Sequence, residues 1–196
     1  MKKIALQLIV LSLSFLVISP MKIEAAEKHH AVHWSYTGHG KPAKWAQLNP
    51  DYETCSNGMA QSPINITKAE KADLPKLEFQ YQETVPSIVN YGHTIQINLA
   101  SGNFLKVGSQ QLELLQLHFH TPSEEQINGK RSDMVAHFVH KSAEGQLGVV
   151  ALLIKPGARN KAFTPIFQHL PSKGETITVE NLKLDLNAML PSNKNY

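Results

Sequence analysis

The sequence predicts a mainly β fold, in which a sheet of mostly antiparallel strands is accompanied by a few short helices. Stretches in which polar and apolar residues alternate, such as 94–99, are typical of strands with one buried face. Turn pairs that contain glycine separate these stretches, at 102–103, 128–129, 144–145 and 156–157. Residues 161–170 have a helical pattern, and they predict one short helix.

The elements follow one another in a simple order. Residues 29–57 are rich in Gly, Pro, Trp and Tyr without periodicity, and we expect them to form an irregular arm. Strands are expected from residue 76 onward. The continuous apolar run 147–154 predicts a strand that is buried on both faces.

The N-terminus predicts export from the cytoplasm. Two lysines follow Met1, residues 4–19 carry no charge, and Ala25 offers a small side chain for cleavage. This is the pattern of a secretory signal peptide, so we expect a signal at 1–25 and one domain at 26–196, periplasmic or secreted. An uncleaved anchor is the alternative, but the sixteen apolar residues are fewer than the roughly 20 that span a bilayer. We therefore expect no stable membrane anchor after cleavage.

Composition narrows the class of protein. The chain has 196 residues, enough for one domain with a core, and 42% hydrophobic with 18% charged residues excludes a disordered or fibrous chain. The formal net charge is +3, most of it from residues 1–25, so we expect no nucleic-acid partner. Cys55 is the only cysteine. It is a free thiol, or its partner lies on another chain or in sequence that this chain lacks.

Histidines on two neighbouring strands predict a metal site. A strand over 112–120 places alternate residues on one face, namely Leu114, Gln116, His118 and His120, and turns Leu115, Leu117 and Phe119 to the other. If the strand over 134–140 pairs with it antiparallel, His137 faces His118 and His120, while His140 projects to the opposite face. Three neutral imidazoles would leave zinc an open fourth position, as in catalytic sites. The alternative is that these histidines are ordinary core or surface residues.

Other residues near the three histidines suit such a site. Gln116 shares their face, and its amide oxygen could accept the second N–H of a ligand imidazole. Val139, on the same face as His137, and Val149 on the next strand would form an apolar wall for a small uncharged substrate. His93 lies in a turn before a strand, where it could carry protons to solvent or be an ordinary exposed histidine.

Several motifs together resemble those of the α-class carbonic anhydrases of bacterial type. They occur in the order and at about the spacing of that family, from residue 33 to the end of the chain. The matching stretches are His-Trp-Ser-Tyr at 33–36, Gln-Ser-Pro-Ile-Asn at 61–65, Gly-His at 92–93, Gln-Leu-His-Phe-His at 116–120, Pro-Ser-Glu at 122–124 and His-Phe-Val-His at 137–140.

The resemblance implies a central twisted, mostly antiparallel sheet and zinc-dependent, reversible hydration of carbon dioxide to bicarbonate and a proton. By matched position it implies zinc ligands at His118, His120 and His137, with Gln116 as a partner of the first. It implies a proton shuttle at His93, a water-network tyrosine at Tyr36 and a carbon dioxide pocket at Val139 and Val149. Glu124 resembles the glutamate that orients a threonine hydroxyl over the site.

The sequence also departs from the family pattern. A Ser-Leu-Thr-Thr-Pro-Pro-Cys segment, with that threonine and a cysteine that would pair with Cys55, is expected beyond Tyr196, so we expect a chain whose C-terminal strands are missing. Such a chain would be weakly active, or a catalytically silent zinc- or ligand-binding module. Val135 stands where the family usually has a glutamate that accepts from the third ligand. Glu125 stands where many members have histidine, and we expect that change to have little effect.

Overall fold

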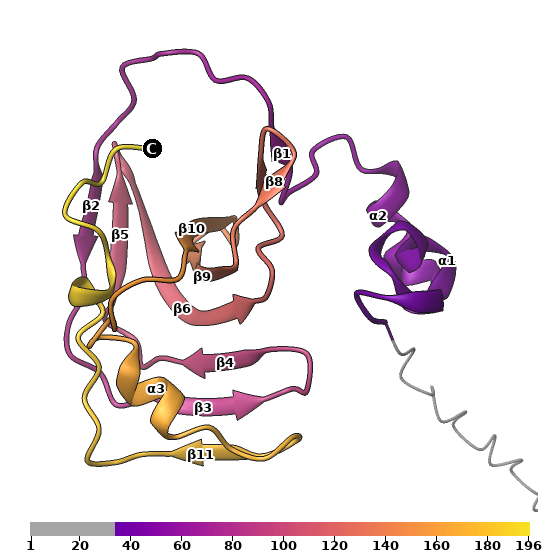
Figure 1. The fold of residues 1–196 in the computed structure, drawn as a ribbon. Helices are drawn as coiled ribbons and strands as arrows, with labels where there is room; N and C mark the ends of the chain where they lie inside the picture. Colours follow the sequence, from indigo (N-terminus) through magenta and orange to yellow (C-terminus); the bar gives the residue numbers. More distant parts are fainter. Residues whose placement is uncertain (1–33) are drawn as a thin grey trace, which may run out of the picture.

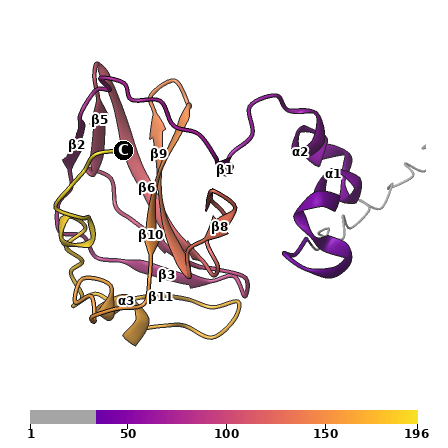
Figure 2. The ribbon, with the colours of Figure 1, turned by 45° about the horizontal axis from the view of Figure 1, so that its top comes forward.

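The computed structural model describes residues 34–196, so the predicted signal peptide lies outside the described residues. The principal element of the described chain is one eight-stranded sheet, with two-residue strands and short helices around it. The strands of the large sheet are β2 (Leu77–Gln80), β3 (Ser87–Asn90), β4 (Ile95–Asn98), β5 (Phe104–Val107), β6 (Gln110–His120), β9 (Met134–Ser142), β10 (Leu147–Ile154) and β11 (Thr176–Thr178). Figures 1 and 2 show that this sheet is strongly twisted. The prediction of a mainly β fold is therefore confirmed.

The long strand β6 organises the large sheet. Its neighbours along one edge are β5 and then β4, and β9 pairs along the other edge, all antiparallel. The order from edge to edge is β10-β9-β6-β4-β3-β11, with β2 added beside β5. A second, three-stranded sheet joins β1 (Asn65–Ile66), β7 (Gln126–Ile127) and β8 (Lys130–Arg131). In it β1 and β7 are parallel, and the β7–β8 hairpin is antiparallel.

The helices are short. The N-terminal arm contains η1 (Gly38–Gly40), η2 (Pro42–Lys44), α1 (Trp45–Leu48), η3 (Pro50–Tyr52) and α2 (Thr54–Asn57), and the later helices are α3 (Thr164–Gln168) and η4 (Asn187–Met189). Helix α3 lies within the predicted range 161–170. In Figure 2 the arm lies beyond β1 and β8, on the other side of the molecule from α3. Within residues 34–196 no helix has the length and hydropathy that a membrane crossing requires.

The hydrophobic core lies between one face of the large sheet and the segments that contain α3 and η4 (Figure 1). Side chains of β6 and β9 contribute much of it, including Leu117, Phe119, Ala136 and Phe138. Because strand residues alternate between faces, the intervening histidines of these strands are turned to the opposite side, toward the arm. Packing of this apolar face against the core therefore holds the sheet in place, and the other face of the same sheet carries the candidate site.

A β-bulge in β6 overturns part of the predicted alternation. The pairing to β9 passes from Leu114 to Gln116 against one step on the partner strand, so Leu115 is the additional residue. Leu114 is consequently buried in the core, not on the face of Gln116, and Leu115 is 39% exposed. The expected positions of these two leucines were therefore wrong, because strict alternation takes no account of a bulge.

Strand β10 also differs from its prediction. Its even-numbered residues Val150, Leu152 and Ile154 pack against the core, but Leu147, Val149 and Leu153 are exposed. Among the described residues β10 pairs with β9 alone, so it is an edge strand of the sheet. Within the described residues 34–196, one face of β10 is left exposed, so the expectation of burial on both faces is wrong. An apolar run in the sequence does not reveal what covers each face of the strand.

Candidate metal centre and active site

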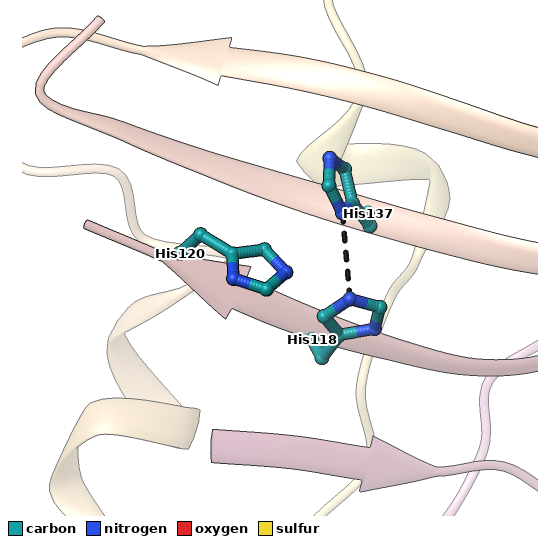
Figure 3. A group of neighbouring side chains, drawn as sticks. All are labelled: His118, His120 and His137. Atoms are coloured by element: carbon teal, nitrogen blue, oxygen red, sulfur yellow. Dashed lines mark hydrogen bonds between the residues drawn. The ribbon is translucent and has the colours of Figure 1, made fainter. Parts of the chain in front are cut away.

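The pairing of β6 with β9 brings the three predicted histidines together. His118 lies directly opposite His137, and His120 lies two residues further along β6 on the same face. The ring centroids are 4.9 to 5.1 Å apart in all three pairs. One nitrogen from each ring lies within 4.8 Å of the others. Figure 3 shows the three imidazoles converging from the two strands. We call this group the histidine trio.

In two of the rings, the nitrogen that faces away from the trio lies beside a hydrogen-bond acceptor from another side chain. The Nδ1 atom of His118 lies 2.9 Å from Oε1 of Gln116. The Nε2 atom of His137 lies 2.5 Å from Oε1 of Glu125. Both acceptors favour a proton on the outer nitrogen, because an amide or carboxylate oxygen can only accept. The inner nitrogens, Nε2 of His118 and Nδ1 of His137, are then left with lone pairs.

His120 has a comparable outer partner. Its Nδ1 lies 3.1 Å from the hydroxyl of Tyr36, and that hydroxyl donates to Oε1 of Glu124 at 2.9 Å. Burial first, and then the hydrogen bond to Glu124, raises the pKa of Tyr36, so its proton is retained. Since the hydroxyl proton is directed at the carboxylate, the oxygen is free to accept from His120. The Nε2 atom of His120 is buried and makes no hydrogen bond with any residue from 34 to 196.

The inner nitrogens fit a zinc ion. Nε2 of His118 and Nδ1 of His137 lie 3.3 Å apart (dashed line in Figure 3). Two nitrogens bound tetrahedrally at 2.0–2.1 Å from one zinc ion are roughly 3.3 Å apart. Lone pairs of neutral rings repel one another at this distance unless a cation or a proton lies between them. The geometry of the trio is therefore compatible with the binding of one metal ion.

The protonation of the rings supports the same interpretation. Burial, followed by repulsion from the neighbouring rings, lowers the pKa of His118 to about 4. Burial, followed by repulsion from His137, lowers the pKa of His120 to about 4 as well. These rings are therefore neutral at pH 7, which is the state that binds metals.

Two carboxylates lie at the edge of the trio. Oε2 of Glu124 is 3.2 Å from Nε2 of His120 and 3.9 Å from Nδ1 of His137. We expected Glu124 to orient a threonine; within residues 34–196 its hydrogen-bonding partner is Tyr36. Glu125 was expected to matter little, and the structure instead pairs it with His137. Burial opposes its charge, but the hydrogen bond from His137, a backbone hydrogen bond and the attraction of His137 and His120 together outweigh burial and lower the pKa of Glu125.

Two cavities adjoin the trio. One of about 400 Å³ is mostly aromatic, and it is lined by Trp34, Tyr36, Trp45, Tyr52, Cys55, Pro63, His118, His120 and Glu124. A second of about 300 Å³ is lined by Ser62, Pro63, Ile64, Ile66, Glu124, Glu125, His137, Val149 and Ala151. Val139 lies directly opposite Val149 in the β9–β10 pairing. The two predicted valines therefore lie side by side next to the trio.

The remaining predicted residues lie around this centre. His93 is exposed in the turn before β4, and its ring centroid is 4.2 Å from that of Trp34, an edge-to-face contact. His140 projects to the core side of β9, fully buried, with Nε2 2.7 Å from the hydroxyl of Tyr81. Cys55 is an exposed free thiol at the rim of the aromatic cavity.

Comparison with known proteins identifies the family. Residues 40–196 match the description of eukaryotic-type carbonic anhydrases. This chain belongs to the carbonic anhydrase family. The match covers the arm from Gly40 onward, both sheets and the histidine trio.

Individual carbonic anhydrases give the same result. The enzyme of Pectobacterium carotovorum is 39% identical over 172 residues, which cover 88% of this chain and 70% of the relative. The α-carbonic anhydrase of Photobacterium profundum superposes with a TM-score of 0.75 at 39% identity, covering 83% of this chain and 73% of that one. The Thermovibrio ammonificans enzyme, solved with the inhibitor sulfanilamide, gives 0.80 at 33% identity, covering 84% and 74%.

Proposed function

We propose that this protein catalyses the zinc-dependent, reversible hydration of carbon dioxide to bicarbonate and a proton. The observation that carries the proposal is the convergence of three inner nitrogens in the trio, each on a ring whose outer nitrogen has a hydrogen-bond partner. His118, His120 and His137 would hold the zinc ion. When bound, zinc supplies hydroxide at neutral pH because it lowers the pKa of water to about 7.

The protein's own residues would hold the rings of the ligand histidines in their orientations. Gln116 holds the proton of His118 on Nδ1, so that Nε2 faces the site. Tyr36 holds the Glu124 carboxylate in place and accepts from His120. These fixed partners reduce the reorganisation that the ligands need when the metal binds.

Substrate binding would use the side of the trio near Val149, and proton release would use the side near the aromatic cavity. Val139 and Val149 offer carbon dioxide, a small uncharged molecule, an apolar surface beside His137. Hydration releases one proton for each bicarbonate formed. His93, exposed near the aromatic cavity, would accept that proton and pass it to buffer in solution. An imidazole suits this role because its ordinary pKa lies near neutrality.

The test is stopped-flow carbon dioxide hydration by the purified protein, with zinc and after removal of zinc by a chelator. Turnover that requires zinc, and is lost in His120→Asn but kept in His39→Asn, supports the proposal; His39 is an exposed histidine of the arm. Zinc binding without turnover would instead support the silent binding module. Failure to bind zinc would contradict both the proposed enzyme and a zinc-binding module.

Export is part of the proposal. Residues 1–25 have the pattern of a signal peptide, so the enzyme would act on carbon dioxide and bicarbonate outside the cytoplasm. Cell fractionation followed by N-terminal sequencing tests this. A mature N-terminus near Ala26 is expected, and an uncleaved protein in the cytoplasm would contradict export.

A further inference from the structure

We infer that Glu125 is the positioning residue that holds His137 in its ligand orientation, a role that rests on the proposed zinc site. Oε1 of Glu125 lies 2.5 Å from Nε2 of His137, the nitrogen that faces away from the other rings. The carboxylate side chain is 14% exposed, and its Oε2 has no hydrogen-bond partner among the described residues. Its principal polar contact is therefore the ligand histidine.

The first ligand shows how such a partner is normally placed on this sheet. Gln116 lies two residues before His118 on the same face of β6, and it accepts from Nδ1 at 2.9 Å. Val135 has the same relation to His137 on β9, and its side chain is fully buried and apolar. The strand of His137 therefore supplies no acceptor from the equivalent position. Glu125, from the turn after β6, supplies one from outside the strand.

The turn holds Glu125 firmly. The hydroxyl of the fully buried Ser123 donates to the backbone carbonyl of Glu125 at 2.7 Å, and it accepts from the backbone N–H of Ser132 at 2.9 Å. The guanidinium of Arg131 donates to the carbonyl of Ser123. The next residue, Gln126, begins β7 in the three-stranded sheet. This network fixes the backbone that carries Glu125, so the contact of its carboxylate with His137 is preorganised.

The chemical consequence follows from the acceptor. A carboxylate keeps the proton of His137 on Nε2 and leaves the Nδ1 lone pair directed at the trio. It also raises the basicity of the imidazole more than a neutral amide does, and losing such a partner typically weakens metal binding by about 10–100-fold. Glu125 thus replaces, from the turn, the acceptor that Val135 does not provide.

The experiment measures the zinc dissociation constant by competition with a chelator. Glu125→Ala is expected to bind zinc about 10–100-fold more weakly than the parent. Glu125→Gln keeps an acceptor but loses the charge, and we expect an intermediate loss. The matched control is Glu144→Ala, an exposed glutamate in the β9–β10 hairpin, which should leave affinity unchanged. Equal affinity of Glu125→Ala and the parent would overturn the inference.

A rescue variant separates positioning from mere folding. Adding Val135→Glu to Glu125→Ala places a carboxylate two residues before His137, in the arrangement that Gln116 has with His118. Zinc affinity should return to within a few-fold of the parent, and the visible spectrum of the cobalt-substituted protein should return with it. A double variant that folds with parental thermal stability but stays as weak as Glu125→Ala would contradict the inference.

A metal-free measurement distinguishes this inference from the proposed function. Nitrogen-15 NMR of the chelator-treated protein reports which nitrogen of His137 carries the proton. We expect Nε2–H in the parent and in Glu125→Gln, and a mixture of tautomers in Glu125→Ala. If the parent binds no zinc but the tautomer of His137 differs between the parent and Glu125→Ala, only the metal site is refuted. If the tautomer in Glu125→Ala is the same as in the parent, the role of Glu125 is refuted.

Discussion

The hydroxyl of Tyr81 and Nε2 of His140 lie 2.7 Å apart in the core, on the side of β9 opposite the histidine trio. His140 is fully buried, and burial lowers the pKa of its ring, so the imidazole is neutral. Its Nδ1 lies 3.2 Å from the carbonyl of Gly148, to which it donates. Nε2 must then accept, and Tyr81, whose pKa is raised by burial, keeps the proton that it donates.

Tyr81→Phe should destabilise the protein by about 1–3 kcal/mol, because it leaves the buried Nε2 of His140 without a donor. The free energy of unfolding in urea, measured near pH 7, checks this. Tyr91→Phe is the matched control, because Tyr91 is 49% exposed and a surface change usually stays within about 0.5 kcal/mol. Equal effects of the two substitutions would show that the Tyr81–His140 bond contributes nothing.

The bulge in β6 predicts different costs for adjacent leucines. Leu114 is buried in the core, so Leu114→Ala should cost about 2–5 kcal/mol of unfolding free energy. Leu115→Ala removes a side chain that is 39% exposed, and it should cost clearly less. Urea unfolding of the two variants side by side measures the difference. A larger cost for Leu115→Ala than for Leu114→Ala would contradict the position of the bulge at Leu115.

The metal-free protein should lose stability as the pH falls from about 7 to 5. The pKa of His118 and of His120 is about 4 in the folded protein, against about 6.5 in an unfolded chain. Between these values the unfolded chain binds more protons than the folded one, so acidification favours unfolding. Urea unfolding in the presence of a chelator, at several pH values, tests this.

The control for the pH dependence exchanges one histidine at a time. His118→Asn removes one of the groups with a lowered pKa, and it should give a shallower fall of stability with acidification. His39→Asn, in the exposed arm, should leave the slope as it is in the parent. A slope that His118→Asn does not change would contradict the assignment of the effect to the trio.

If His93 carries protons, His93→Ala should lower kcat for carbon dioxide hydration by at least about tenfold in weak buffer. The value of kcat/KM should change little, because that ratio does not include proton transfer to buffer. Added imidazole should restore kcat by accepting the proton in place of the missing side chain. A variant that loses kcat/KM instead, or that imidazole does not rescue, would assign His93 a role in the architecture of the site.

The sequence predicted the parts of this structure that depend on periodicity. The mainly β fold and the facing of His118 and His137 follow from alternation and from antiparallel pairing, and the short helix α3 follows from the helical pattern of residues 161–170. The position of Leu114 was not predictable in this way, because a bulge adds one residue without a strong signal in the sequence.

The role of Glu125 escaped prediction for a different reason. Its carboxylate reaches His137 through a turn whose path depends on the Ser123 and Arg131 hydrogen bonds, and no periodic pattern encodes that path. Two adjacent glutamates, four and five residues after the last histidine of the His-x-His strand, were the available signal. Edge exposure of β10 was likewise unpredictable, because it depends on which strands pair with it.

The bulge at Leu115 divides β6 into two segments that have different neighbours on the edge opposite β9. Before the bulge, β6 pairs with β5. After the bulge, where β6 carries His118 and His120, it pairs with β4. An irregularity there absorbs changes in the path or length of the β2–β5 ribbon before they reach Gln116. The β2–β5 ribbon can therefore differ in path or length while the side chains of Gln116 and of the three histidines of the trio keep their mutual geometry.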